Sequence, residues 1–430
     1  MPTPFERRVA TSWLTLKIWR NMALIDPPLT TDKLRDIVQD AHLNFLVGAG
    51  ASSDLFEPLG DIERILTELG EAEPTTDAIK LARASIYSKF FDAVIDKNHE
   101  VLGRSSDEAK AVLDTYEVFA TAINRILLRR RSSILHKQVN IFTTNIDIAF
   151  EVAFETLALE SNDGFAGKFV PKFNTSNFGS LRYRRSLQYE NVSEVPTFNL
   201  LKMHGSVTWQ APTATVMDGE LPDIDFDRTL SGITATKEAL EACRPHLIEL
   251  PEELSTAALL EAAEGKVFDP SISIFMLEYE KLAIVNPTKE KFQTTVLNEN
   301  YYDLFRIFAN ELEKENSVLF VLGFSLRDEH IRQLIIRAAR ANPTLQVMIF
   351  CYSSKGAMAV RKLIPGPAVK NGNILIVEPD VSDGSKIGAL DLKTITEQYF
   401  APIIPAPKPK PDIRVDVNVT GQADVDVVEP

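Results

Sequence analysis

The stretch Leu43-Asn44-Phe45-Leu46-Val47-Gly48-Ala49-Gly50-Ala51-Ser52 joins a largely apolar run to a glycine-rich turn. A short run of this kind is typical of a strand that is buried on both faces of a parallel sheet. Glycines after such a strand let the backbone approach a phosphate and leave N–H groups that can donate to it. The alternative is that the turn serves only tight packing. The candidate ligand-binding residues in this turn are Gly48, Ala49, Gly50 and Ser52.

Further apolar runs recur along the chain, with helical patterns such as Ile331–Ala341 between them. The runs are Val139–Phe142, Thr197–Met203, Leu282–Val285, Val318–Leu322, Val347–Cys351 and Ile374–Val377. Regular alternation of strand and helix predicts an α/β fold. We expect a doubly wound, mostly parallel, Rossmann-like sheet with helices on both faces.

The composition of the 430 residues, 45% hydrophobic and 25% charged, is that of an ordinary globular protein. A net charge of −14 disfavours nucleic acid as a direct partner. The arginine clusters at 129–131 and 182–185 are interpreted as solvated faces. With only Cys243 and Cys351, neither a disulfide framework nor a four-cysteine zinc site is expected, and we predict no metal.

The sequence shows no membrane or export signal. No apolar run reaches the roughly 18 residues that a membrane-spanning helix needs. Lys17 interrupts the apolar stretch that follows Arg7 and Arg8, and no small-residue cleavage site follows. We therefore expect a cytoplasmic protein without contact to a membrane.

Two long excursions interrupt the strand and helix rhythm of the domain that we expect over residues 30–400. Residues 53–137 have an almost entirely helical pattern, and residues 209–279 are mixed and acidic with a helical middle. Both follow strand ends directly, where an open α/β sheet places its binding crevice. The excursions are therefore candidates for a lid or a small second domain.

Both termini lie outside that domain. Residues 1–29 form an amphipathic pattern with Trp13 and Trp19, which predicts a helical extension that docks on the chain's own core or on another subunit. Residues 401–430 begin with a proline-rich linker and continue with alternating apolar residues that match a β-hairpin. This tail is either disordered or adds strands to another subunit or partner.

Polar motifs follow three other predicted strands. Thr143-Thr144-Asn145-Ile146-Asp147 follows the run that ends at Phe142, His204-Gly205-Ser206 follows Met203, and Gly323-Phe324-Ser325 follows Leu322. Each motif has a purely structural interpretation: a helix cap at Asn145 or Asp147, a buried structural histidine, or a helix start capped by Ser325. Because parallel strands end at one edge of a sheet, we expect all the motifs to converge there. Two glycine turns at that edge predict a phosphate-bearing ligand.

These motifs resemble those of the sirtuin family in order and spacing, over roughly residues 31–400. Within that family they are most similar to prokaryotic sirtuin-like proteins of anti-phage defence. Those include NAD hydrolases of the Thoeris type and proteins paired with a HerA-type hexameric ATPase. The resemblance implies that NAD is the substrate. It implies that Asn145 orients the ribose and the attacking water, that His204 is the general base, and that Ile146 and Asp147 hold the nicotinamide amide. The diphosphate and ribose would contact Gly48, Ala49, Gly50, Ser52, Gly323 and Ser325, with Thr144 at the place where the family usually has glutamine.

Departures from the family pattern affect the acyl-lysine substrate of sirtuin deacylases more than they affect NAD. The zinc module of four cysteines is absent, and the loop at 56–61 keeps only Pro58 of the family's usual stretch. Tyr352 and Ser353 stand where the family usually places asparagine at the adenosine end. We therefore expect NAD hydrolysis to nicotinamide and ADP-ribose rather than deacylation.

The resemblance also implies how the enzyme is controlled. An unregulated NAD hydrolase would be toxic, so we expect regulation through homo-oligomerisation and the partner ATPase, with nucleic acid reached only through that partner. One alternative is a non-catalytic scaffold that binds NAD or ADP-ribose, although such a protein would not need both Asn145 and His204. The other is a nuclease subunit, which would need a carboxylate metal cluster that the sequence does not show.

Overall fold

The computed structural model describes residues 29–57, 62–71, 76–130, 135–188, 190–210, 224–251, 253–284, 295–364, 371–379 and 389–404. The predicted N-terminal extension, apart from its last residue, lies outside these ranges. So do the predicted tail beyond residue 404 and Pro58.

The centre of the fold is a seven-stranded sheet in which every neighbouring pair of strands is parallel. Its strand order is β14-β13-β12-β1-β2-β8-β3. The strands are β1 (His42–Val47), β2 (Gln138–Thr143), β3 (Glu160–Asn162), β8 (Thr197–Lys202), β12 (Ser317–Leu322), β13 (Gln346–Phe350) and β14 (Ile374–Val377). The chain first builds outward from β1 through β2 and later returns to place β12 on the other side of β1. The predicted doubly wound α/β sheet is therefore confirmed, with its topological switch between β1 and β12.

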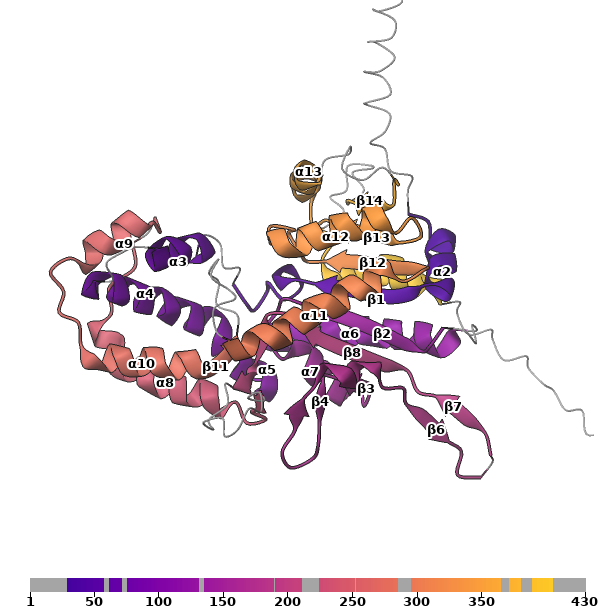
Figure 1. Ribbon diagram of the computed structural model, residues 1–430, viewed down its shortest axis with the longest axis horizontal. Coiled ribbons are helices and arrows are strands. Elements are labelled where there is room, and N and C mark those ends of the chain that lie inside the picture. Colours follow the sequence, from indigo (N-terminus) through magenta and orange to yellow (C-terminus); the bar gives the residue numbers. More distant parts are fainter. Residues whose placement is uncertain are drawn as a thin grey trace, which may run out of the picture.

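Helices cover both faces of this sheet (Figure 1). On one face lie α2 (Thr31–Asp40), α6 (Asp107–Arg129) and α14 (Leu392–Ile395), and Phe45 of β1 packs against Phe119 of α6 with ring centroids 5.2 Å apart. On the other face lie α11 (Thr295–Glu313) and α12 (Glu329–Ala341), and Phe142 of β2 meets Phe308 of α11 at 4.8 Å. Burial on both faces explains why these strands are apolar without alternation.

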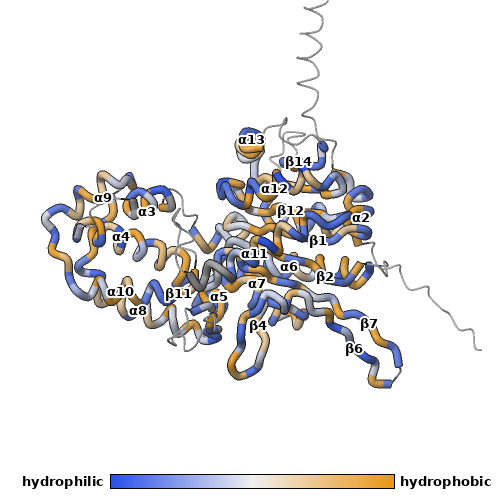
Figure 2. The backbone as a smooth tube through the Cα atoms, viewed as in Figure 1, coloured by the Kyte–Doolittle hydropathy of each residue, from blue (hydrophilic) through white to orange (hydrophobic). Residues whose placement is uncertain are grey.

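A lobe of helices lies beside the sheet, at the left of Figure 1. It contains α3 (Ile62–Glu71), α4 (Asp77–Phe90), α8 (Ser231–Cys243), α9 (Thr256–Ala263) and α10 (Pro270–Lys281). The two predicted excursions thus meet in space, and Tyr87 of α4 packs on Tyr279 of α10 with ring centroids 4.7 Å apart. Hydrophobic and hydrophilic segments alternate along these helices, as expected for amphipathic helices around a small core (Figure 2).

Three further helices are α5 (Asn98–Gly103) and α7 (Ala149–Thr156), which both contact α6, and α13 (Ser354–Leu363), which contacts β14. Two hairpins project from the sheet, β4–β5 (Phe165–Ala166 and Lys172–Phe173) and β6–β7 (Tyr183–Arg185 and Val192–Glu194). None of the helices in the described ranges combines the length and the apolar content needed to cross a membrane.

One predicted strand belongs to a different sheet. Residues 282–284 form β11, which pairs antiparallel with β9 (Gly205–Gln210) in a small sheet that also contains β10 (Asp225–Phe226). The prediction that this run belongs to the parallel sheet is therefore wrong, because a short apolar run does not reveal its pairing partner. The small sheet forms the junction between the His204 turn and the helical lobe.

Candidate functional site

The strands that carry the four motifs are immediate neighbours, in the order β12-β1-β2-β8. Val47 pairs with Leu322 on one side and with Thr143 on the other, and Thr143 pairs with Lys202. The residues that follow these strands therefore emerge together at the carboxyl edge of the sheet, next to the topological switch. The convergence predicted from the sequence is confirmed.

The two glycine turns pack against each other. A Cβ atom at Gly48 would lie 2.7 Å from the carbonyl oxygen of Gly323, and one at Gly50 would lie 2.8 Å from the same oxygen. Gly50 N donates to Gly323 O at 2.9 Å, Ala51 N to Gly48 O at 3.0 Å, and Ser52 N to Ala49 O at 3.2 Å. The prediction that this turn leaves its N–H groups for a phosphate is wrong for these amides, because they donate to carbonyl oxygens of the two glycine turns.

Asn145 lies in the loop between β2 and α7 and is buried. Its Nδ2 donates to Gly48 O at 3.3 Å, to Ser52 Oγ at 3.3 Å and to the hydroxyl of Tyr116 at 3.4 Å. Its backbone N donates to Thr143 Oγ1 at 3.0 Å. In contrast, Asn145 Oδ1 is buried with no hydrogen-bond partner among the described residues. A buried carbonyl oxygen without a partner is costly, so this acceptor is available for a ligand or water.

Asp147 is held rigidly beside Asn145. Its Oδ1 accepts a hydrogen bond from Ala149 N at 3.0 Å at the start of α7, and its Oδ2 accepts one from Ser52 Oγ at 3.3 Å. Burial raises the pKa of the Asp147 carboxyl, although the charge of Lys202 acts in the opposite direction. Both carboxylate oxygens of Asp147 therefore accept hydrogen bonds from the protein, Oδ1 from the start of α7 and Oδ2 from Ser52.

A buried ion pair between Lys202 and Glu151 contacts the loop that carries Asn145 and Asp147. Lys202 Nζ lies 2.8 Å from Glu151 Oε1 and also donates to the backbone carbonyl of Asp147. The Lys202 side chain is only 3% exposed. Burial raises the pKa of Glu151, and the charge of Lys202 opposes that shift. Sequence analysis missed this pair, although a lysine in an otherwise apolar run two residues before His204 was a usable signal.

His204 occupies the turn between β8 and β9. Gly205 has φ of +77°, and a Cβ there would overlap the carbonyl oxygen of Ala283, so this turn requires glycine. His204 Nε2 lies 3.5 Å from Asp328 Oδ2. Asp328, not Ser325, is the cap of α12, because its Oδ1 accepts hydrogen bonds from His330 N and Ile331 N. Ser325 and Gly323 are exposed at the same edge.

Most of the predicted residues line one small cavity of about 90 Å³. The sheet edge contributes Ala49, Ser52, Thr144, Asn145, Ile146, Asp147 and His204. The other side consists of Phe56 and Glu57, from the loop that departs from the family pattern, and of Phe90 and Val94, which sequence analysis did not single out. Gly48, Gly50, Gly323 and Ser325 lie outside its lining. The volume corresponds to about three waters of roughly 30 Å³ each, whereas ligand pockets usually hold about 300–1,000 Å³.

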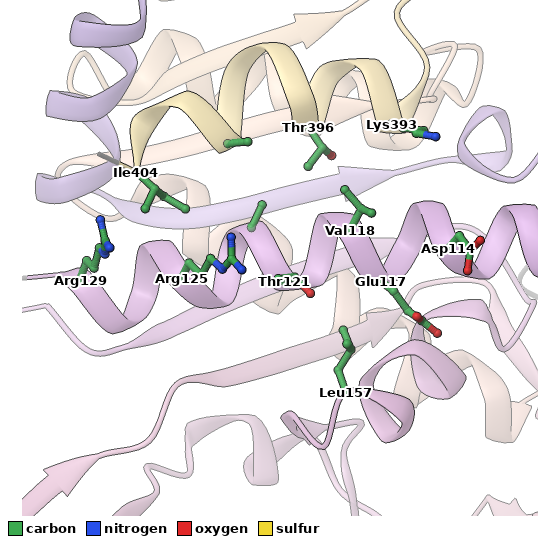
Figure 3. Close-up of a pocket in the computed structure, with 12 residues that line it drawn as sticks. Asp114, Glu117, Val118, Thr121, Arg125, Arg129, Leu157, Lys393, Thr396 and Ile404 are labelled. Atoms are coloured by element: carbon green, nitrogen blue, oxygen red, sulfur yellow. The ribbon is translucent and has the colours of Figure 1, made fainter. Parts of the chain in front are cut away.

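A larger hollow of about 880 Å³ lies elsewhere, along the outer face of α6 near α14 (Figure 3). Its lining mixes acidic residues such as Asp114 with basic residues such as Arg125, and it contains none of the motif residues. Size alone therefore does not identify the functional site. Among the described residues, no cluster of His, Cys, Asp or Glu side chains is arranged to hold a metal ion.

Comparison with known proteins adds one family match. Residues 278–364, from α10 to the end of α13, match the family model of the SIR2-like domain. No curated protein matches the chain. A chain from a solved structure, described as the structural basis for the mechanism and regulation of Sir2 enzymes, aligns with a TM-score of 0.34 and 13% identity. That alignment covers 87% of this chain and 97% of the other. The segment that matches the SIR2-like domain model includes Gly323, Ser325 and Asp328.

Proposed function

We propose that this protein hydrolyses NAD⁺ to nicotinamide and ADP-ribose, with Asn145 and His204 as catalytic residues. The observation that carries the proposal is that both line one cavity at the carboxyl edge of the sheet, where Asn145 Oδ1 has no hydrogen-bond partner among the described residues. The position beside the β1 and β12 switch is where open α/β sheets bind nucleotides. The SIR2-like segment supplies one side of that edge.

Cleavage of the bond between nicotinamide and ribose depends more on positioning of the ribose and the water than on acid catalysis. Nicotinamide leaves as a neutral amine, so the difficult part is the positive charge that develops on the ribose, as in glycoside cleavage. Asn145 is held through Nδ2, so its Oδ1 would accept a hydrogen bond from water or a ribose hydroxyl in a fixed orientation. His204 would accept a proton from that group as the general base.

Access to the cavity would depend on the helical lobe. A cavity of about 90 Å³ is several times smaller than a dinucleotide site. Phe90, the last residue of α4, and Val94, in the helical turn that follows, form part of its lining on the lobe side. We therefore place the control of activity in the lobe, whose displacement would open the site. From the motif resemblance we propose that oligomerisation and a HerA-type ATPase provide this control in anti-phage defence.

The test is to incubate the pure protein with NAD⁺, with and without the candidate ATPase, and to separate the products by chromatography. We expect nicotinamide and ADP-ribose in equal amounts. Asn145→Ala and His204→Ala should each lower the rate at least about 100-fold. Complete consumption of NAD⁺ by both variants would contradict the assignment. A parallel incubation with DNA distinguishes the nuclease alternative.

The small size of the cavity also favours a second candidate, a scaffold that binds NAD or ADP-ribose without cleaving it. Such a protein needs the acceptor at Asn145 but no general base. Calorimetry would then show binding that survives His204→Ala, while NAD⁺ stays intact in every condition of the chromatographic assay.

A further inference from the structure

Asp328 uses its two carboxylate oxygens on two different neighbours. Oδ1 accepts hydrogen bonds from His330 N at 3.0 Å and Ile331 N at 3.2 Å and so caps α12. Oδ2 lies 3.5 Å from His204 Nε2. Both side chains are largely buried, with 17% of His204 and 12% of Asp328 exposed. Because the cap fixes the carboxylate plane, the second oxygen is held toward the imidazole.

Capping alone does not require an aspartate at this position. Serine, threonine and asparagine cap helices about as well as aspartate does. The separation of 3.5 Å is long for a hydrogen bond, but such contacts commonly shorten when the substrate is bound. A base that is oriented by a third, acidic group is a recurring arrangement in enzymes, because the acid fixes the tautomer of the base and stabilises its protonated form.

We propose that Asp328 is a positioning residue that fixes the tautomer and orientation of His204. This inference rests on the proposed function, in which His204 accepts a proton. With Oδ2 facing Nε2, the neutral imidazole carries its proton on Nε2 and its lone pair on Nδ1. Proton transfer then runs from the reacting hydroxyl or water to Nδ1, and the resulting imidazolium is stabilised by the Asp328 carboxylate.

The helical lobe supplies a matched control. Asp269 caps α10 by accepting a hydrogen bond from Ser271 N at 2.9 Å, and its Oδ2 lies 3.7 Å from His246 Nε2. This pair has the same cap and the same imidazole neighbour, but it is more exposed and does not line the cavity. Asp269→Asn therefore makes the same chemical change away from the proposed chemistry.

The experiment compares Asp328→Asn and Asp328→Ser, which both keep a cap, with Asp269→Asn in the full-length protein. We expect kcat for NAD⁺ hydrolysis to fall about 10- to 100-fold in both Asp328 variants, with KM changed less than about threefold and Asp269→Asn at the wild-type rate. An undiminished kcat in both Asp328 variants overturns the proposal, since capping would then be the residue's whole role.

A second measurement does not depend on turnover. The ring nitrogen shifts of His204 are read from protein with ¹⁵N-labelled histidine, and the signal is assigned by its loss in His204→Gln. We expect the Nε2-protonated tautomer in the wild type and a changed pattern in both Asp328 variants. Unchanged shifts overturn the proposal whatever the activity. If the wild type leaves NAD⁺ intact, the proposed function fails, and these shifts alone decide whether Asp328 positions His204.

Discussion

The sheet edge and the helical lobe, which lie side by side in Figure 1, differ in where their polar and charged side chains lie. At the sheet edge, the side chains of Asn145, Asp147 and Lys202 are buried, and Lys202 Nζ donates a hydrogen bond to the backbone carbonyl of Asp147. In the lobe, apolar and aromatic residues fill the interior, and the charged pairs Lys237–Asp96 and Arg244–Asp92 lie at the surface.

This difference indicates a division of roles. Buried polar groups in a fully parallel sheet have little freedom to rearrange, which suits groups that must orient a substrate. Amphipathic helices that pack through apolar side chains can shift as a body at lower cost. The structure therefore separates a rigid polar sheet edge from a helical lobe that lies against it.

The largest effect is expected from breaking the ion pair under the site. Lys202→Met removes the cation and leaves Glu151 and the Asp147 carbonyl without it, which should cost about 3–5 kcal/mol of unfolding free energy. On the lobe surface, Lys237 Nζ lies 2.6 Å from Asp96 Oδ2, and Lys237→Met should cost less than about 1 kcal/mol of unfolding free energy. Urea unfolding measures both. Equal losses would show that the two regions do not differ in this way.

A smaller effect is expected from loosening the cover. Phe90→Leu enlarges the cavity, and we expect it to lower stability by about 1–2 kcal/mol and to raise kcat/KM for NAD⁺ severalfold. Phe275→Leu, in the lobe core away from the cavity, should cost similar stability without raising kcat/KM. A Phe90→Leu rate at or below the wild-type rate would contradict the gating role of the lobe.

The smallest effect concerns two buried aspartates with opposite pKa shifts. At Asp147, burial raises the pKa above the ordinary 3.8. At Asp227, near the start of α8, burial also acts to raise it, but hydrogen bonds from Gly232 N and Thr229 outweigh burial and lower the pKa. As pH rises from about 3.8 through the raised pKa of Asp147, the folded state loses stability relative to the unfolded state, because only the unfolded carboxyl ionises freely.

Asp147→Asn should therefore stabilise the protein at pH 7, and the gain should vanish near pH 4. Asp227→Asn should instead destabilise the protein at pH 7, and this loss should shrink at low pH. The charge of Asp227 contributes stability above its unfolded pKa, and this contribution is lost as pH falls through the lowered folded pKa. Unfolding midpoints of both variants from pH 3 to pH 8 give the comparison. If the unfolding midpoints of both variants change with pH as those of the wild type do, neither aspartate has a shifted pKa.

The sequence predicted the sheet well, because strands buried on both faces need apolar runs and parallel strands must end at one edge. Strands β1, β2, β8 and β12 and their polar ends were all visible in this way. Long helices such as α6 were also predicted, since their periodicity is strong. The pairing of β11 with β9 was not, because a short apolar run carries no information about its partner.

Residue type and order in this sequence were sufficient to select Asn145, Asp147 and His204 as site candidates. Only the tertiary structure placed Tyr116 and Ser52 on the Asn145 amide, Lys202 under Asp147, and Asp328 beside His204. It also brought the two helical excursions together in one lobe, where Tyr87 packs on Tyr279. These contacts join residues far apart in the chain, and their formation depends on how the elements pack rather than on any local pattern of residues.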